Sequence, residues 1–202
     1  MRLFSYIVAH DTGFAPNPFW GCCTLANCKP GIRRTATEGD WIVGLSRKSA
    51  GNRIIYAMKI DETIDFATYY RDERFVAKRP DFTTSAVVCK CGDNIYEPHP
   101  DGSFRQLRST HSNGKHENPE TKAHDLGGRY VLVGDKFYYF GVDGPDLPPG
   151  LEALRVARGH KCRFTPDIIQ AFNVFISQFD QGVMGHPTTW PTHDHSWRQS
   201  ES

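Results

Sequence analysis

Short runs of apolar and aromatic residues, interrupted by polar turns, set the pattern of this chain. Residues 3–8 (LFSYIV) are aromatic and β-branched, which predicts a strand. Residues 41–44 and 54–60 predict two further strands, and the polar segment 46–52 between them predicts a hairpin loop. The first 60 residues therefore favour a sheet built from short strands.

The middle of the chain is less regular. Residues 86–89 (AVVC) are compatible with a strand, whereas the polar, histidine-bearing segment 98–126 predicts a loop. Two more strands are expected at residues 130–133 and 136–140. They flank Gly134-Asp135, a two-residue turn whose leading glycine suits the type II′ geometry of a hairpin.

Two segments predict helices. Residues 66–71 follow Asp65, a residue type that caps helix N-termini. Residues 165–180 begin with Thr165 as a potential cap and Pro166 at the first helical position. The spacing of apolar residues in this second segment predicts one packing face, formed by Ile168, Ile169, Phe172, Phe175, Ile176 and Phe179.

These elements predict an α+β fold, with a small, mostly antiparallel sheet or a partly open β-barrel and a C-terminal amphipathic helix. We expect one domain over residues 1–182 and a polar, mobile tail over residues 183–202 that carries Trp190 and Trp197. Residues 9–35 show no regular period, and a long irregular segment in a compact domain usually has a functional reason.

Composition narrows the class of protein. The 202 residues include 24 basic and 23 acidic side chains, and the net charge of +1 argues against a globally basic nucleic-acid binder. No apolar run approaches the roughly 18 residues that would cross a bilayer. The first residues also lack the pattern of a signal peptide, so we expect a cytoplasmic protein without membrane contact.

Six cysteines leave two possibilities open. Reduced thiols are expected in the cytoplasm, and buried free thiols fit the sequence. Zinc is the alternative, with Cys23 and Cys28 as one ligand pair and Cys89 and Cys91 as another, although these spacings depart from the usual zinc knuckle. We assign no metal ligand and no cofactor.

Charge is unevenly distributed along the chain. Between residues 29 and 59 only Glu38 and Asp40 oppose seven basic residues, whereas residues 61–73 hold five acids and one arginine. A basic face of this kind suits a phosphate backbone. The seven basic residues are Lys29, Arg33, Arg34, Arg47, Lys48, Arg53 and Lys59.

Aromatic residues accompany this basic segment. Phe19 and Trp20 lie in the irregular loop and, with Trp41, could stack on a nucleobase. Asn17 could read a base edge through its amide. The alternative is a core position, which the strand pattern favours for Trp41.

Two histidine–aspartate pairs, His10-Asp11 and His124-Asp125, raise the possibility of catalysis. Nucleophilic catalysis would need Cys23 or Cys28 within reach of His10, with a carboxylate orienting the ring. Capping or surface roles are the simpler interpretation of such loop histidines.

Three blocks of sequence resemble the nucleotide modification associated domain family, second type. The first is HDTGFAPNPFWGCCTLANCKPGIRRTATEGDWIVG, the second CKCGDNIYEP, and the third LRSTHSNGKHENPETKAHDLGGRYVLVGDKFYYFG. The resemblance implies a role in bacterial or phage systems that modify DNA bases. It points to candidate site residues in these blocks: His10, Asp11, Asn17, Cys23, Cys28, Lys29, Arg33, Arg34, His111, His124 and Asp125.

A second resemblance concerns the fold. Arg33 and Arg34, then Gly39, Asp40 and Trp41, then the strand 54–60 are similar to EVE-like and ASCH-like members of the PUA superfamily. This resemblance implies a PUA-like barrel with an aromatic-lined pocket for RNA or a modified DNA base.

Our leading hypothesis is a domain of a phage or anti-phage base-modification system that binds DNA or a nucleotide with a modified base. Lys29, Arg33 and Arg34 would hold phosphate, while His10, Asp11 and Asn17 would contact the base. An enzyme with a Cys/His site acting on a nucleotide or base is the first alternative. A zinc-stabilised interaction module is the second, and protein partners are unknown.

Overall fold

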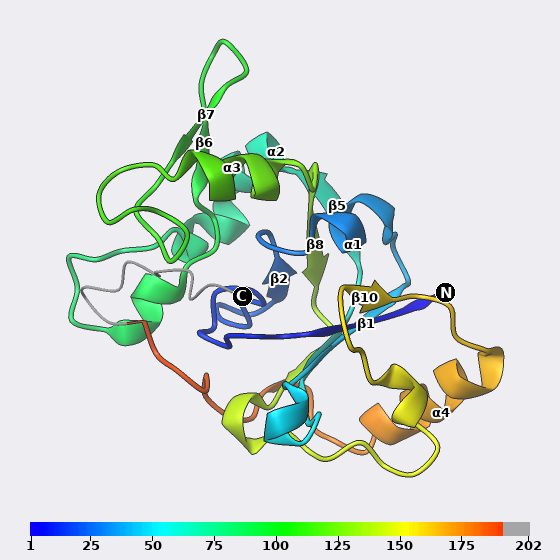
Figure 1. Ribbon diagram of the computed structural model, residues 1–202. Coiled ribbons are helices and arrows are strands. Elements are labelled where there is room, and N and C mark those ends of the chain that lie inside the picture. Colours follow the sequence, from blue (N-terminus) through cyan, green and yellow to red (C-terminus); the bar gives the residue numbers. More distant parts are fainter. Residues whose placement is uncertain (192–202) are drawn as a thin grey trace.

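Figure 1 shows the computed structural model, which describes residues 1–191. Its largest sheet has six strands in the order β10-β1-β3-β4-β9-β11. Strand β1 pairs in parallel with β3, and β9 pairs in parallel with β11, whereas the other pairings in this sheet are antiparallel. The strands are Leu3–Ile7 (β1), Trp41–Leu45 (β3), Ile54–Lys59 (β4), Phe137–Tyr139 (β9), His160–Lys161 (β10) and Gly182–Val183 (β11).

A second, antiparallel sheet has the order β2-β8-β5, with Cys23–Leu25 (β2), Tyr130–Gly134 (β8) and Glu62–Asp65 (β5). The predicted hairpin between residues 130–133 and 136–140 is therefore wrong, because β8 and β9 lie in different sheets. At Gly134 the chain crosses from one sheet to the other. An added Cβ there would collide with the Lys59 carbonyl, so the crossing depends on glycine.

The segment expected to be a loop at residues 98–126 contains regular structure. It includes β7 (Phe104–Gln106), which pairs with β6 (Tyr96–Pro98), and helix α3 (Pro119–Leu126). The Asn118 side chain caps α3 by accepting hydrogen bonds from the N–H groups of residues 120 and 121. The strand considered at residues 86–89 is instead a 3₁₀ helix, Val87–Cys91.

The remaining helices are short. Helix α1 spans Pro30–Thr35, and α2 spans Phe66–Arg71, as predicted, with the Asp65 carboxylate accepting from the Thr68 N–H at 2.9 Å. Helix α4 covers Pro166–Ile176 and ends before the predicted residue 180. The other 3₁₀ helices are Lys48–Ala50, Glu73–Lys78, Gly141–Asp143 and Glu152–Leu154.

Alternation along the central strands divides the core between the two faces of the large sheet. Phe4, Ile42 and Met58 pack on one face together with residues of β2 and α1. Leu3 and Trp41 pack on the other face, where the Trp41 ring lies 5.5 Å from that of Phe172 in α4. Helix α1 and the loop before it are thereby held on the first face.

The fold belongs to the α+β class, and its sheets are mixed: six of the eight strand pairings within residues 1–191 are antiparallel and two are parallel. In this part of the chain β10 and β11 form the two edges of the large sheet, and no pairing closes it into a barrel. None of the helices in residues 1–191 is long and apolar enough to traverse a membrane.

The segment expected to be a mobile tail packs on the domain as far as the structure describes it. Val183 pairs with Tyr139, the Thr188 N–H donates to Asp11, and the Trp190 ring stacks on Phe19. These contacts attach residues 183–191 to the rest of the domain. Trp197 and the rest of residues 192–202 lie outside the described residues.

Candidate active site

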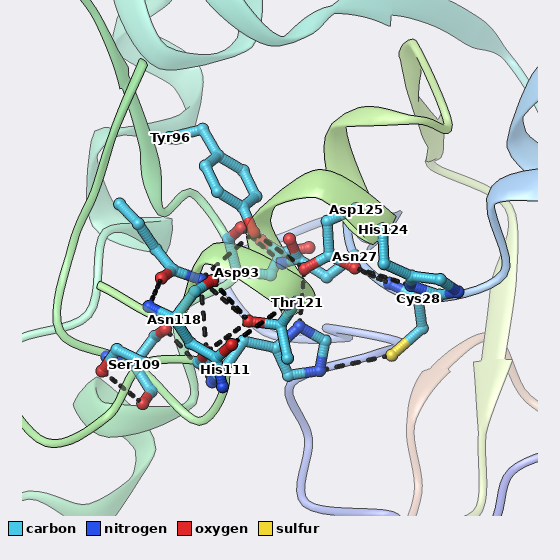
Figure 2. Close-up of polar contacts among 12 residues, drawn as sticks. Asn27, Cys28, Asp93, Tyr96, Ser109, His111, Asn118, Thr121, His124 and Asp125 are labelled. Carbon is cyan, nitrogen blue, oxygen red and sulfur yellow. Dashed lines mark hydrogen bonds and ion pairs between the residues drawn. The ribbon is translucent and has the colours of Figure 1, made fainter. Parts of the chain in front are cut away.

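Cys28, His111 and Asp125 form a continuous chain of polar contacts (Figure 2). The Cys28 Sγ lies 3.4 Å from Nε2 of His111, and Nδ1 of the same ring lies 2.6 Å from Oδ2 of Asp125. A thiol, an imidazole and a carboxylate in this order have the connectivity of a cysteine–histidine–aspartate triad.

Asp125 is completely buried and accepts hydrogen bonds from three donors. Oδ1 accepts from the Cys28 N–H at 2.7 Å, and Oδ2 accepts from His111 and from the Tyr96 hydroxyl at 2.9 Å. Burial raises the pKa of this carboxyl, but the hydrogen bond and charge of His111, the nearby His124 ring and the Cys28 N–H outweigh it and hold the pKa well below the usual range. Asp125 is therefore an anion at neutral pH.

His111 is held as a cation by its neighbours. Burial lowers the pKa of the ring, which packs against Phe14 and leaves only 18% of its side chain exposed. The charge of Cys28 and the hydrogen bond and charge of Asp125 more than offset this effect and raise the pKa to about 10. A buried imidazolium beside a sulfur atom is the environment in which cysteines become nucleophilic.

The backbone around Cys28 is unusual. Cys28 and Lys29, which follow β2 and precede α1, both adopt positive φ angles, 59° and 41°. Non-glycine residues in this region carry strain, and such residues are enriched at functional sites. The strained turn directs Cys28 toward the loop that carries His111 (Figure 2).

The buried side chain of Arg33 holds this turn in place through hydrogen bonds to the backbone. It is fully buried, and its guanidinium donates to the carbonyl oxygens of Cys28, Asp125 and Tyr130. Burial lowers the pKa of Arg33 to about 10, with the charges of Asp125 and Cys28 acting in the opposite direction. Arg33 thus connects α1, α3 and β8, and it is not part of a phosphate-binding rim.

Cys28 and His111 open onto a cleft of about 900 Å³. Ligand-binding clefts commonly measure about 300–1,000 Å³, so this one is large enough for a small organic molecule. Its walls come from the end of β1 and the residues after it, the loop before α1, the loop after β3, the loop 110–113, α3 and the start of β10. The side chains on these walls that matter for ligand chemistry are Tyr6, His10, Phe14, Cys28, Lys29, Arg47, His111, Asn118, Glu120, Thr121, His124 and His160.

The triad also forms the one group of three potential metal ligands within residues 1–191, with donor atoms within 4.8 Å of one another. However, the contacts of Asp125 are explained by protein hydrogen bonds: Oδ2 accepts from His111 and Tyr96, and Oδ1 accepts from the Cys28 N–H. Zinc sites use three or four protein ligands. The hydrogen-bonded triad fits this geometry better than a metal centre does.

Several residues predicted for the site lie at the cleft. Lys29, His10 and His124 line it together with Cys28 and His111, and Asp125 lies directly behind His111. Nε2 of His10 lies 3.3 Å from the Arg47 guanidinium. His111 takes the role that the sequence had suggested for His10.

Other predicted residues belong to the interior. Asn17 is fully buried; its amide donates to the carbonyls of Gly13 and Cys91 and its Oδ1 accepts from Lys78, so it cannot read a base edge. Cys23 lies in β2 in the core, where burial raises its thiol pKa far above the usual range. Both residues are structural.

Trp41 and Asp11 are likewise buried. Trp41 packs between the sheet and α4, the core position that was the alternative to stacking. Asp11 accepts from the Tyr139 hydroxyl at 2.6 Å and from the Thr188 N–H. Burial raises the pKa of Asp11, with these hydrogen bonds opposing the shift. Neither side chain reaches the cleft.

The last predicted residues lie at the surface, away from the lining of the cleft. Phe19 is half-buried between Trp20 and Trp190, with ring centroids 5.7 and 6.0 Å away. Arg34 donates to the Gly127 carbonyl. The aromatic group formed by Phe19, Trp20 and Trp190 thus holds the C-terminal segment.

Sequence reasoning missed Tyr96, Thr121 and His160. Thr121 Oγ1 donates to the His111 carbonyl at 2.6 Å and so positions the loop that carries the ring. The potential cap at Asn118-Pro119 was the available signal for α3, and an expected helix there would have placed Thr121 and Asp125 one turn apart on the same face.

The fold and the site define an α+β domain with a cysteine–histidine–aspartate arrangement at the base of a cleft of about 900 Å³. The model of the family described as nucleotide modification associated domain 2 matches residues 1–194, nearly the whole chain. The chain belongs to this family, which confirms the resemblance seen in the sequence. No curated protein and no solved structure matches it.

Proposed function

We propose that the protein is a cytoplasmic enzyme of a DNA base-modification system that acts on a nucleotide or nucleobase with Cys28 as its nucleophile. The observation that carries this proposal is the contact of Cys28 Sγ with His111 Nε2 at 3.4 Å, at the base of the 900 Å³ cleft. The family match supports nucleotide chemistry.

The chemistry follows from the order of the groups. With the proton on His111, the Cys28 sulfur attacks an electrophilic carbon of the substrate as a thiolate and forms a C–S bond. The imidazolium then donates its proton to the substrate atom that receives the displaced electron pair. Asp125 keeps the ring oriented and stabilises its positive charge. A water or a second nucleophilic substrate would then attack the same carbon, pass its proton to His111 and return the C–S electron pair to the Cys28 sulfur.

Thiol reactivity tests this proposal. We expect iodoacetamide at pH 6.5 to modify Cys28 at least about tenfold faster than the exposed Cys162, as measured by mass spectrometry of peptides. The variant His111→Gln should remove this difference. Equal rates for the two cysteines, or a rate at Cys28 that His111→Gln leaves unchanged, would refute a nucleophilic Cys28.

The second candidate function is binding of a modified base without catalysis. It is favoured by the volume of the cleft, about 900 Å³, which has room for a base turned out of a duplex without any reaction at Cys28. The PUA-like fold implied by the second sequence resemblance would fit this alternative, because such domains bind bases without reacting with them. If the protein only binds a modified base, the wild type and Cys28→Ser should bind a modified DNA duplex with equal affinity in an anisotropy titration. Neither protein should convert a free nucleotide. Turnover of a nucleotide that Cys28→Ser abolishes would decide for the enzyme.

A further inference from the structure

We infer that Lys29 and Arg47 form a phosphate-binding wall in the cleft, so that its ligand is a nucleoside 5′-monophosphate. This inference rests on the proposed function in taking Cys28 as the group that reacts with the ligand. The phosphate itself is inferred from the cationic side chains that line the cleft. It narrows the substrate class from any nucleobase derivative to a nucleotide that carries a phosphate.

The lining of the cleft is strongly biased toward cationic side chains. Among its described residues Glu120 is the one carboxylate. Opposite it in charge stand Lys29 and Arg47, whereas the charge of the protonated His111 is balanced by its ion pair with Asp125. Three further histidines in the lining can donate hydrogen bonds. Two cations that no carboxylate of residues 1–191 neutralises attract an anionic ligand to the cleft.

Lys29 is the central group of this wall. Its Nζ lies 4.8 Å from the centroid of the Tyr6 ring, and within residues 1–191 no carboxylate forms an ion pair with it. Burial lowers the pKa of this ammonium group, partly opposed by Cys28. A desolvated cation that no carboxylate neutralises attracts an incoming anionic ligand.

Arg47 contributes from a different element, the loop after β3. Its Nη2 lies 3.3 Å from Nε2 of His10. Burial and the charge of Arg47 lower the pKa of His10, so the ring is neutral at pH 7 and can accept this hydrogen bond. The contact holds the guanidinium at the cleft, and its remaining N–H groups suit phosphate oxygens.

The arrangement favours a free nucleotide over a polynucleotide. A backbone-tracking surface needs a row of cations, but Arg33 is buried and Arg34 donates to the Gly127 carbonyl. Two phosphate-binding side chains at one cleft suit a single phosphate group. The base would then lie near Cys28 and His111.

Binding can be measured without the thiol chemistry. Calorimetric titrations would use Cys28→Ser protein with the four deoxynucleoside 5′-monophosphates, the four deoxynucleosides, inorganic phosphate and a 12-nucleotide single strand. We expect at least one monophosphate to bind about tenfold or more tightly than its nucleoside, and inorganic phosphate to compete with it. Lys29→Met and Arg47→Gln should each remove this preference.

Lys48→Gln is the matched control, because Lys48 is an exposed neighbour of Arg47 that does not line the cleft. Equal binding of monophosphates and nucleosides, no binding of any probe, or an equal loss in Lys48→Gln would overturn the inference. Binding of the single strand alone would assign the wall to nucleic acid and reject a mononucleotide. An inert Cys28 thiol would refute the proposed enzyme while leaving a measured phosphate preference intact.

Discussion

The backbone N–H of Cys28 and the carboxylate of Asp125 form a 2.7 Å hydrogen bond between residues 97 positions apart. The other oxygen of the same carboxylate accepts from Nδ1 of His111 at 2.6 Å. One buried anion therefore fixes both the backbone of the cysteine and the ring that faces its sulfur. The geometry of the site depends on Asp125 more than on either of the two reacting groups.

Asp125→Asn should reduce the reactivity of Cys28 and weaken the fold. An amide nitrogen cannot accept a hydrogen bond, so at least one of the donors now bonded to Asp125 loses its acceptor. We expect the alkylation rate of Cys28 at pH 7 to fall about tenfold. The free energy of unfolding should fall by about 1–3 kcal/mol, measured by urea denaturation.

His124→Ala is the control for this variant. The exposed His124 ring lies 3.7 Å from Asp125, and exposed contacts of this kind contribute little, about 0–1 kcal/mol. Its alkylation rate should match that of the wild type. If the alkylation rate of Cys28 fell as much in His124→Ala as in Asp125→Asn, the result would argue against the central role of the contact between Asp125 and His111.

The protonation of His111 provides a second prediction. Because the neighbours of His111 raise its pKa to about 10, its ring should give imidazolium NMR signals at pH 8. Cys28→Ala removes the sulfur that helps to raise this pKa, and the value should fall by about one unit or more. A ring that titrates near 6.5 in both proteins would contradict the ion-pair description.

The same shift predicts how stability depends on pH. The folded-state pKa of His111 lies above the unfolded value near 6.5, so its contribution to stability is complete below that pH. The contribution is lost as the pH rises from about 6.5 to about 10. The difference in unfolding free energy between wild type and His111→Gln should therefore shrink across this range, which denaturation at pH 6, 8 and 10 would measure.

Local patterns were sufficient for the parts of the fold that depend on neighbours in sequence. Strand β1, the β3–β4 hairpin and the Asp65 cap of α2 lie where periodicity and capping rules placed them. The connection from β8 to β9 is not the hairpin that the sequence predicted. The turn residues Gly134-Asp135 favour a hairpin, but the strands that pair with β8 lie in a different sheet from β9. Tertiary pairing overrode the local preference there.

The site was harder to predict because its contacts are distant in sequence. The family resemblance placed Cys28, His111 and Asp125 among the candidates, but 83 positions separate the cysteine from the histidine, and no spacing rule joins them. Arg33 and Asn17 were misjudged for another reason. Polar residues are usually exposed, and only the structure shows that buried carbonyl and amide groups satisfy these two.

Arg33 should be essential for folding, whereas its neighbour Arg34 should not. Arg33→Ala removes the donor to three carbonyl oxygens, and we expect a loss of about 3 kcal/mol or more in unfolding free energy. Arg34 is exposed and donates to a single carbonyl, so Arg34→Ala should cost about 1 kcal/mol or less. Thermal and urea unfolding of the two variants compares them directly, and equal stability would contradict the structural role of Arg33.

The stacking of Trp190 on Phe19 leads to the last prediction. The two rings lie 6.0 Å apart at an interplanar angle of 17°, and two residues earlier Thr188 binds Asp11 through its N–H and hydroxyl groups. Trp190→Ala should lower the unfolding free energy by about 1–2 kcal/mol, because it removes a partly buried aromatic contact.

Amide exchange would show where this loss is felt. Since Asp11 adjoins His10 at the cleft, exchange in residues 9–20 should accelerate in Trp190→Ala, while exchange in β3 and β4 should follow only the global change in stability. Trp190→Phe keeps an aromatic ring and should retain most of the protection in residues 9–20. Unchanged exchange there in Trp190→Ala would mean that the C-terminal segment does not support the wall of the cleft that carries His10.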